Sequence, residues 1–170
     1  MTTSNKCSRM RAVMRILAID PGYDRLGVAV VEGDASRPTL IWSDCILPRK
    51  GRAEERLAHI AKAVEEAIAT HTPDALAIET LFFSVNKKTA LGVAEARGAV
   101  LAVAGAAALP VREYSPQQIK LAVTGDGRAN KAAVAHMIPR LLTLSAKKRL
   151  DDELDAIGIG ITALASSPHP

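Results

Sequence analysis

The sequence predicts an α/β domain with one mixed five-stranded sheet and helices on both faces of that sheet. Three observations lead to this fold class. Short apolar runs rich in Val and Ile alternate with turn residues over residues 15–47. Apolar residues recur every three or four positions over residues 52–70, as in an amphipathic helix. From residue 75 onwards, short apolar runs alternate with longer helical patterns, which favours parallel pairing of the later strands.

The first three strands are predicted over residues 15–20, 26–32 and 39–47. The breaker sequence Pro-Gly-Tyr-Asp-Arg separates the first two strands, and a turn over residues 34–38 precedes the third. Loops this short join antiparallel neighbours, because a parallel connection needs a crossover of a dozen residues or more. The three strands therefore form an antiparallel meander.

A helix is predicted over residues 52–70, and Pro73 ends it. The run Ala-Leu-Ala-Ile-Glu at residues 75–79 is a buried strand. A second helix, with many Ala and Gly residues for close packing, covers residues 87–108, and a short fifth strand covers residues 109–114. The last two strands are expected to pair parallel.

Ser115 begins the next helix, with Pro116 at its first position and Gln118 three residues after the serine. This arrangement is a capping box, in which the serine and glutamine side chains each bond an otherwise unpaired backbone N–H. A Gly-Asp-Gly turn then leads to two further helices, over residues 130–142 and 151–165. The predicted order is βββ-α-β-α-β-ααα.

Length and composition exclude several classes of protein. The chain has 170 residues, 48% hydrophobic and 24% charged, which suits a single domain over residues 14–166. No apolar run approaches the ~18 residues of a membrane span, so no membrane association is expected. Cys7 and Cys45 lack the spacing of a disulfide framework or a metal site, which favours a reducing, cytoplasmic compartment. Residues 1–13 are expected to be a disordered extension and residues 167–170 a tail.

Charge is unevenly distributed along the chain. Residues 86–149 hold eleven basic and three acidic residues, a net charge of +8, so the rest of the chain carries −4. A basic half beside an acid-bearing half is typical of a protein that holds a polyanion and places a carboxylate-bound metal on it. A solvated lysine surface is the alternative.

Four carboxylates are candidates for a metal site. Asp20 and Glu79 each end an apolar strand, and Asp152 and Asp155 lie three apart near the start of the last helix. If the first and fourth strands are neighbours, the four acids converge, and two Mg²⁺ ions about 4 Å apart can then hydrolyse a phosphodiester. Asp151 is four residues from Asp155 and could share its face instead. Acids in a first turn are also favoured by the helix dipole alone.

Phe82 and several basic residues suggest contact with nucleic acid. Phe82 lies beyond a strand-end acid, next to the basic pair Lys87 and Lys88, as a base-stacking residue requires. Lys131 follows a Gly-rich turn at a helix start, where backbone N–H groups favour phosphate. Lys120 lies on a helix with an apolar face, where a solvated lysine is an equal alternative.

Five motifs occur along the chain in a fixed order. They are Ile-Asp-Pro-Gly at 19–22 with Gly27 following, Ile-Glu-Thr-Leu-Phe at 78–82, Glu-Ala-Arg-Gly at 95–98, Gly-Asp-Gly-Arg-Ala-Asn-Lys at 125–131 and Asp-Glu-Leu-Asp-Ala at 152–156. With these motifs the chain resembles the RuvC-type Holliday junction resolvases over about residues 14–165. The resemblance implies a ribonuclease-H-like fold and a homodimeric endonuclease that nicks two opposing strands of a four-way DNA junction symmetrically, in recombination and repair. It also implies a branch-migration motor of the RuvA–RuvB type as a partner.

Site residues follow from the resemblance by motif position. Two Mg²⁺ ions, for which Mn²⁺ can substitute, would be held by the catalytic acids Asp20, Glu79, Asp152 and Asp155. Phe82 matches the family's base-stacking aromatic, and the expected DNA-binding set is completed by Lys87, Lys88, Lys120, Arg128 and Lys131. Hydrolysis would leave a 5′-phosphate and a 3′-hydroxyl.

The chain departs from the family pattern at three positions, and two other functions compete. Tyr23 stands where many relatives have a small or aliphatic residue, and Gly158 and Gly160 lie in the last helix, where they permit close approach to the sheet or weaken the helix. The first alternative is a ribonuclease-H-like nuclease acting on structured RNA, and the second is a catalytically weak junction-binding protein. Phe82 argues against the first, and the presence of all four acids argues against the second.

Overall fold

The computed structural model describes residues 13–81 and 87–166, with side chains from residue 90 onwards in the second segment. Phe82, residues 1–12 of the expected extension over residues 1–13 and the tail over residues 167–170 lie outside the described residues, as do the side chains of Lys87 and Lys88. Among the described helices, none is long and apolar enough to cross a membrane.

The described strands form one five-stranded sheet in the order β3-β2-β1-β4-β5. The strands are β1 (Met14–Asp20), β2 (Leu26–Gly33), β3 (Thr39–Ile46), β4 (Ala75–Glu79) and β5 (Val111–Tyr114). β2 pairs antiparallel with both β1 and β3, and β4 pairs parallel with both β1 and β5. The mixed sheet predicted from the sequence is therefore confirmed, with three antiparallel strands followed by two parallel ones.

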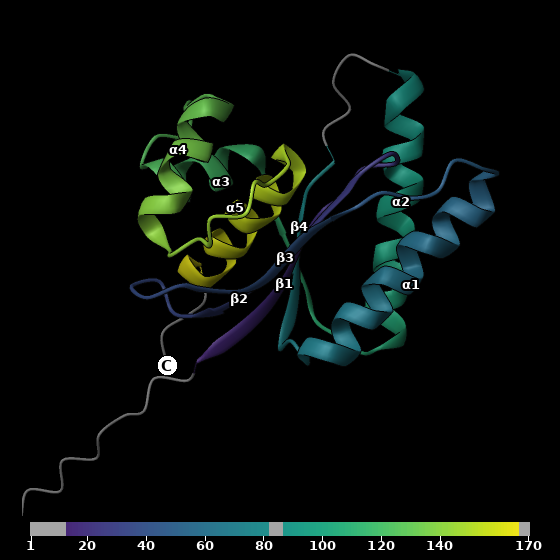
Figure 1. Cartoon of the computed structure of the whole chain (residues 1–170), viewed down its shortest axis with the longest axis horizontal. Helices are drawn as coiled ribbons and strands as arrows, with labels where there is room; N and C mark the ends of the chain where they lie inside the picture. The colour runs from purple at the N-terminus through teal and green to yellow at the C-terminus, as the bar shows by residue number, and fades with distance from the viewer. Residues whose placement is uncertain (1–12, 82–86, 167–170) are drawn as a thin grey trace, which may run out of the picture.

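Helices cover both faces of the sheet (Figure 1). They are α1 (Ala53–His71), α2 (Lys87–Ala106), α3 (Pro116–Thr124), α4 (Lys131–Leu141) and α5 (Asp151–Ala165). α1 and α2 pack together on one face, and α5 lies on the other face against β1 and β2, with α3 and α4 packed on it. The sheet is thus the middle of three layers.

The ends of the helices follow local signals in the sequence. Ser115 caps α3 as predicted: its Oγ accepts from the N–H of Gln118, whose Oε1 accepts from the N–H of Ser115. The predicted helix over residues 87–108 ends two residues earlier, because Ala108 takes a left-handed conformation with φ of 51°. The N–H of Leu109 then reaches the carbonyl of Ala104, which closes the helix by a Schellman motif.

Side chains alternate between the two faces of the sheet along β1 and β4, and this alternation determines the face on which each strand-end acid lies. Ile16 and Ala18 of β1 point into the core beneath α5, whereas Leu17 and Ile19 point towards α1 and α2. Ala75 and Ala77 of β4 also face α5. Because of this alternation, Asp20, two residues after Ala18, and Glu79, two residues after Ala77, lie on the α5 side of the sheet.

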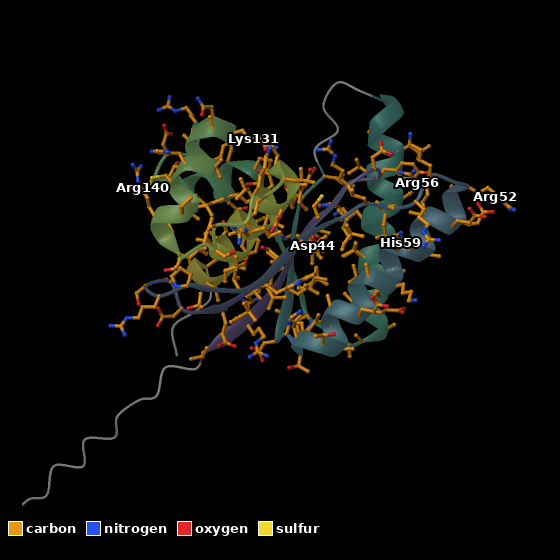
Figure 2. All side chains as sticks on the ribbon, in the orientation of Figure 1. Asp44, Arg52, Arg56, His59, Lys131 and Arg140 are labelled. Carbon is orange, nitrogen blue, oxygen red and sulfur yellow. The ribbon has the colours of Figure 1, made fainter. Side chains whose placement is uncertain are left out.

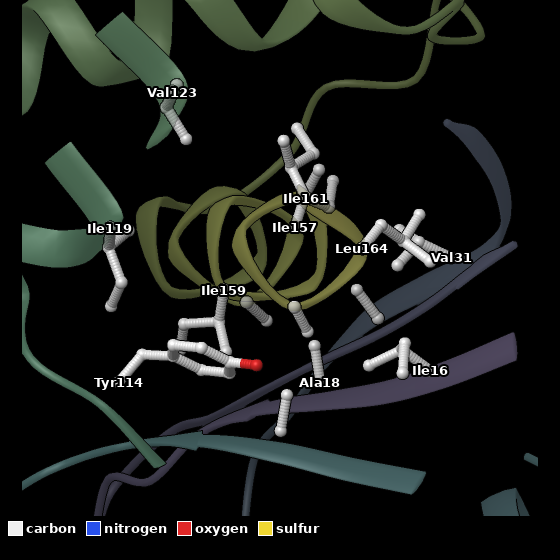
Figure 3. Close-up of a cluster of buried hydrophobic side chains, with 14 of the residues drawn as sticks. Ile16, Ala18, Val31, Tyr114, Ile119, Val123, Ile157, Ile159, Ile161 and Leu164 are labelled. Carbon is white, nitrogen blue, oxygen red and sulfur yellow. The ribbon is translucent and has the colours of Figure 1, made fainter. Parts of the chain in front are cut away.

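α5 is the central helix of its layer (Figure 3). Residues 156–164 of this helix are all buried, against β1 and β2 on one side and α3 on the other. A Cβ at Gly160 would lie 2.6 Å from Cγ2 of Val31 and 3.3 Å from Cβ of Ala18, so this glycine lets α5 approach the sheet closely. A Cβ at Gly158 would meet only ordinary contacts at 3.6 Å or more. The interpretation of the helix glycines as close-approach residues is therefore confirmed for Gly160 only.

Candidate active site

Asp20 and Glu79 lie side by side at one edge of the sheet. β1 and β4 are parallel neighbours in a register that pairs Ile19 with Ile78, so the two residues that follow are adjacent. Both acids face α5, as the alternation of the strands requires. The sequence-based condition for a carboxylate site, that the first and fourth strands be neighbours, is met.

The first turn of α5 lies directly on the sheet beside Asp20. Gly27 of β2 is the register partner of Asp20, and a Cβ at Gly27 would collide with the carbonyl oxygen of Asp152. Only a glycine allows this approach of helix backbone to strand backbone. The contact places Asp152 and, one turn further along, Asp155 over the edge that holds the two strand acids.

The charges of the four acids act on one another. Burial raises the pKa of Asp20 to about 7, with further increases from the charges of Asp155, Glu79 and Asp152 and an opposing effect of Lys131. Burial and the charge of Asp155 likewise raise the pKa of Glu79. Burial also raises the pKa of Asp155, although its hydrogen bond with Lys131 works in the opposite direction.

The structure distinguishes Asp151 from Asp152. Asp152 is partly buried and its charge acts on Asp20, whereas Asp151 is exposed and acts on Asp155 and Lys131. Asp151 lines a groove with the start of α4, which also includes Lys131 and Asp155, and is absent from the lining of the cavity that Glu79 shares with those two residues. Asp152 is therefore the helix acid that joins Asp155 beside the strand ends.

Two lysines border the acids. Lys131 Nζ lies 2.6 Å from Asp155 Oδ2, and Figure 2 shows Lys131 at the start of α4. Burial lowers the pKa of Lys131, but the hydrogen bond and charge of Asp155, with Asp151 and Asp20, raise it overall. Lys120, Lys131, Glu79 and Asp155 line one cavity of about 190 Å³ between α3, α4 and α5. The structure thus brings both predicted lysines to the carboxylates.

Arg128 is the predicted site residue that lies apart from this cavity. It is exposed on the loop between α3 and α4, where its backbone N–H donates to Asp126 Oδ1. Its side chain is not among those that line the cavity with the two lysines.

The four acids have the right ligand atoms for a hard divalent cation, but their side chains are not yet arranged around one. Carboxylate oxygens are the ligands that Mg²⁺ prefers, and mutual repulsion of the kind that raises the pKa of Asp20 is what a bound cation relieves. Within residues 13–81 and 87–166, however, no three His, Cys, Asp or Glu side chains are arranged to hold a metal ion. Asp155 points to Lys131, and Asp152 lies 3.4 Å from an Arg25 nitrogen, so these acids must turn towards Asp20 to share an ion.

Sequence reasoning missed two residues near this edge, Arg25 and Glu153, and gave no reason for a third, Tyr23. Arg25, in the loop after Asp20, pairs with Asp152, and Glu153 is buried between the two helix acids. Tyr23 has a structural reason for its departure from the family pattern: the Arg56 guanidinium lies 4.3 Å from its ring centroid and donates to its carbonyl, and the ring packs on Gly92 of α2. The available signal for Arg25 was its place in the short loop that follows the strand-end acid Asp20.

Comparison with known proteins identifies the family. A family model described as crossover junction endodeoxyribonuclease RuvC matches residues 16–163. The chain belongs to the RuvC family. The RuvC of Moorella thermoacetica is 41% identical over 156 residues, which cover 91% of this chain and 93% of that protein. The RuvC of Chlorobaculum parvum is 41% identical over 153 residues, covering 89% and 82% of the two chains.

Solved structures agree with this assignment. Thermus thermophilus RuvC in complex with a Holliday junction substrate matches with a TM-score of 0.82 and 35% identity, over 88% of this chain and 92% of that chain. The yeast mitochondrial Holliday junction resolvase Ydc2 matches with a TM-score of 0.67 at 12% identity, over 92% and 82%, which shows the shared fold. The expected ribonuclease-H-like fold is confirmed. As a RuvC-family member the chain is a crossover junction endodeoxyribonuclease, a hydrolytic and metal-dependent DNA nuclease.

Proposed function

We propose that this RuvC-family enzyme resolves four-way DNA junctions by nicking two opposing strands symmetrically during recombination and repair. The observation that carries the proposal is the convergence of Asp20, Glu79, Asp152 and Asp155 at one sheet edge, with Lys120 and Lys131 beside them. Acids alone would repel a phosphodiester. The two ammonium groups supply the opposite charge at the place where the DNA backbone must approach.

The four acids are proposed to hold two Mg²⁺ ions, with Mn²⁺ able to substitute. Bound ions would supply an activated water and charge neutralisation at the leaving oxygen. Asp20 and Glu79 provide rigid oxygen donors, because both end strands inside the sheet. Asp152 and Asp155 project from the start of α5, whose residues 156–164 are all buried, so the helix that carries them is held against the sheet.

Lys131 is proposed to exchange Asp155 for a substrate phosphate. It stands at the first position of α4, where Asn130 caps the helix and the helix dipole favours an anion. Lys120 would contact the phosphate from the other side of the cavity, and exposed Arg128 would contact the junction backbone away from the cut. Stacking of Phe82 on an unpaired base, with Lys87 and Lys88 on the adjoining backbone, remains part of the proposal on sequence grounds.

A homodimer is proposed because a four-way junction has approximate two-fold symmetry, which two identical sites can match. α2 offers a surface for a second copy. Gly98 and Gly105 have open space where a Cβ would stand, and Leu91 is 66% exposed. The dimer would act in the cytoplasm with a branch-migration motor of the RuvA–RuvB type. A structured-RNA nuclease and a catalytically weak binding protein are not favoured by the family match.

The test compares a synthetic mobile four-way junction with a linear duplex of the same sequence. The enzyme with Mg²⁺ should cut the junction alone, in paired symmetric nicks with 5′-phosphate ends, and EDTA should stop cleavage. Asp20→Asn should abolish cleavage while it still binds the junction. If Asp20→Asn cuts at the wild-type rate, the assignment of the acids is wrong; if the wild type cuts duplex or structured RNA equally well, the junction assignment is wrong.

A further inference from the structure

Glu153 is an acid buried in the first turn of α5, between Asp152 and Asp155. Its side chain is 3% exposed. Its Oε1 accepts a 2.6 Å hydrogen bond from Ser43 Oγ and a 3.2 Å bond from Lys147 Nζ, and Arg149 Nε lies 3.3 Å away. Ser43 belongs to β3, and the two basic residues belong to the loop that leads into α5. One carboxylate oxygen therefore joins three segments of the chain, which we call the Glu153 clamp.

The basic residues of the clamp are themselves held in place. The Arg149 side chain is 7% exposed and donates to the carbonyl and hydroxyl oxygens of Ser145. Lys147 Nζ also donates to the carbonyl oxygen of Ser43 at 3.2 Å. Buried charges are costly unless they are paired and hydrogen-bonded, so this arrangement is favourable only when all its members keep their geometry.

The start of α5 has little else to hold it at this side. The residue at its N-cap position, Leu150, makes no capping bond with its side chain. The contact with Gly27 fixes how close the first turn comes to β2, and residues 156–164 are packed in the core, but within the first turn itself Glu153 is the one buried side chain. The Glu153 clamp is therefore the side-chain constraint on that turn, because it ties the turn to β3.

Glu153 is not one of the acids that face the strand ends. The charges that act on Asp20 come from Asp155, Glu79, Asp152 and Lys131, whereas the charge of Glu153 acts on Cys45 of β3. Its carboxylate thus lies on the β3 side of the turn. Its Oε1 is engaged by two hydrogen bonds and an ion pair on that side, so Glu153 is placed to hold the turn and not to join the acids at the strand ends.

We propose that Glu153 is a positioning residue: the Glu153 clamp sets the rotation of the first turn of α5, and thereby the placement of Asp152 and Asp155 relative to Asp20 and Glu79. This inference rests on the proposed metal site. Residues that orient metal ligands without touching the ion change metal affinity or activity by about 10–100-fold when they are altered.

The test uses Glu153→Gln, which keeps the size and an oxygen acceptor for Ser43 but removes the charge that pairs with Lys147 and Arg149. Mn²⁺ affinity of the full-length protein is measured by calorimetry without DNA, kcat and KM are measured on the junction, and junction binding is measured in EDTA. We expect about a tenfold loss in Mn²⁺ affinity and in kcat. Junction affinity in EDTA should stay within about twofold, since the DNA-facing lysines are untouched.

Glu32→Gln is the matched control. Glu32 pairs with Arg15 at 2.6 Å at the opposite end of β1 and β2, so its loss affects stability without touching α5. If Glu153→Gln and Glu32→Gln show the same melting temperature, Mn²⁺ affinity and kcat, Glu153 is merely structural and the inference is overturned. If Glu153→Gln does not fold, Ser43→Ala removes the 2.6 Å bond to Glu153 and the 3.4 Å bond from Arg149 Nε, keeps the charge of Glu153, and must lower Mn²⁺ affinity. A wild type that binds no Mn²⁺ and cuts no junction would instead refute the proposed function.

Discussion

Asp20 is a charged residue in a position that disfavours charge. It ends the central strand, faces the buried helix α5 and has three other acids around it. Each of these features stabilises the protonated form, and together they raise its pKa to about 7. Such a group weakens the fold and is retained for chemistry, which is how perturbed acids at functional sites are commonly explained.

Asp20→Asn should therefore stabilise the metal-free protein. A carboxyl whose pKa is raised in the folded state favours folding only while it is protonated, so its destabilising effect grows as pH rises from about 4 to about 7 and is complete above that. In EDTA the variant should melt at nearly the wild-type temperature at pH 4. At pH 8 it should melt higher by about 4–8 °C, which corresponds to about 2 kcal/mol.

Thermal unfolding followed by circular dichroism at the two pH values measures this difference. Asp74→Asn is a suitable control, because Asp74 lies at the start of β4, remote from the site, and accepts a bond from the N–H of Arg15. A melting temperature of Asp20→Asn that stays at the wild-type value at pH 8 would contradict the buried-charge explanation.

The strand acids could be predicted from the sequence, whereas the choice between the helix acids and the residue proposed to position them could not. Asp20 and Glu79 end apolar strands, and the alternation of the preceding residues already decides their face. Asp151 and Asp152 could not be separated, because spacings of three and four both place two residues on one side of a helix. Glu153 is 110 residues away from Ser43, and its burial depends on how a loop crosses β3, for which local sequence gives no signal.

At the scale of elements, the close packing of α5 on the sheet requires a glycine at position 160 but not at position 158. A Cβ at position 160 would lie 2.6 Å from Val31 Cγ2, whereas a Cβ at position 158 would meet side chains at 3.6–3.9 Å. Gly160→Ala should therefore push α5 off the sheet and destabilise the fold by about 1–3 kcal/mol, the usual cost of overpacking a core. Gly158→Ala should be neutral or stabilise it by up to about 1 kcal/mol, because alanine is the better helix former.

Urea unfolding of the two variants measures both free energies, and cleavage of the junction measures their effect on the site. Gly160→Ala should also lose activity, since displacement of α5 carries Asp152 and Asp155 with it. Equal stability of the two variants would show that α5 does not depend on its close approach at Gly160.

Elements were predictable where a strong local signal marks their ends. The capping box of Ser115 and Gln118 marks the start of α3, and Pro73 follows the end of α1. The end of α2 was placed two residues too late, because alanine is a good helix former and Ala107 and Ala108 carry no stop signal. The left-handed turn at Ala108 is imposed by the need to bring the chain back to β5 beside β4.

At the scale of the whole molecule, the proposal that α2 forms the dimer interface can be tested by mutation. Gly98→Glu places a charge on the exposed stripe of small residues, where a second copy would have to desolvate it. We expect this variant to sediment as a monomer at concentrations where the wild type is a dimer, and to lose paired nicking of the junction. Ala69→Glu, at an exposed position of α1, is the control and should remain dimeric. A dimeric Gly98→Glu variant would assign the interface to another face.

The order of the elements along the chain has a consequence for biosynthesis. All five strands precede α5, yet α5 covers one apolar face of the sheet and carries two of the four proposed metal ligands. A nascent chain on the ribosome therefore exposes Ile16, Ala18 and Val31 to the cell until residues 151–165 have been made. Chaperones would bind that apolar face. The active site is complete only after α5, the last described helix, has been translated.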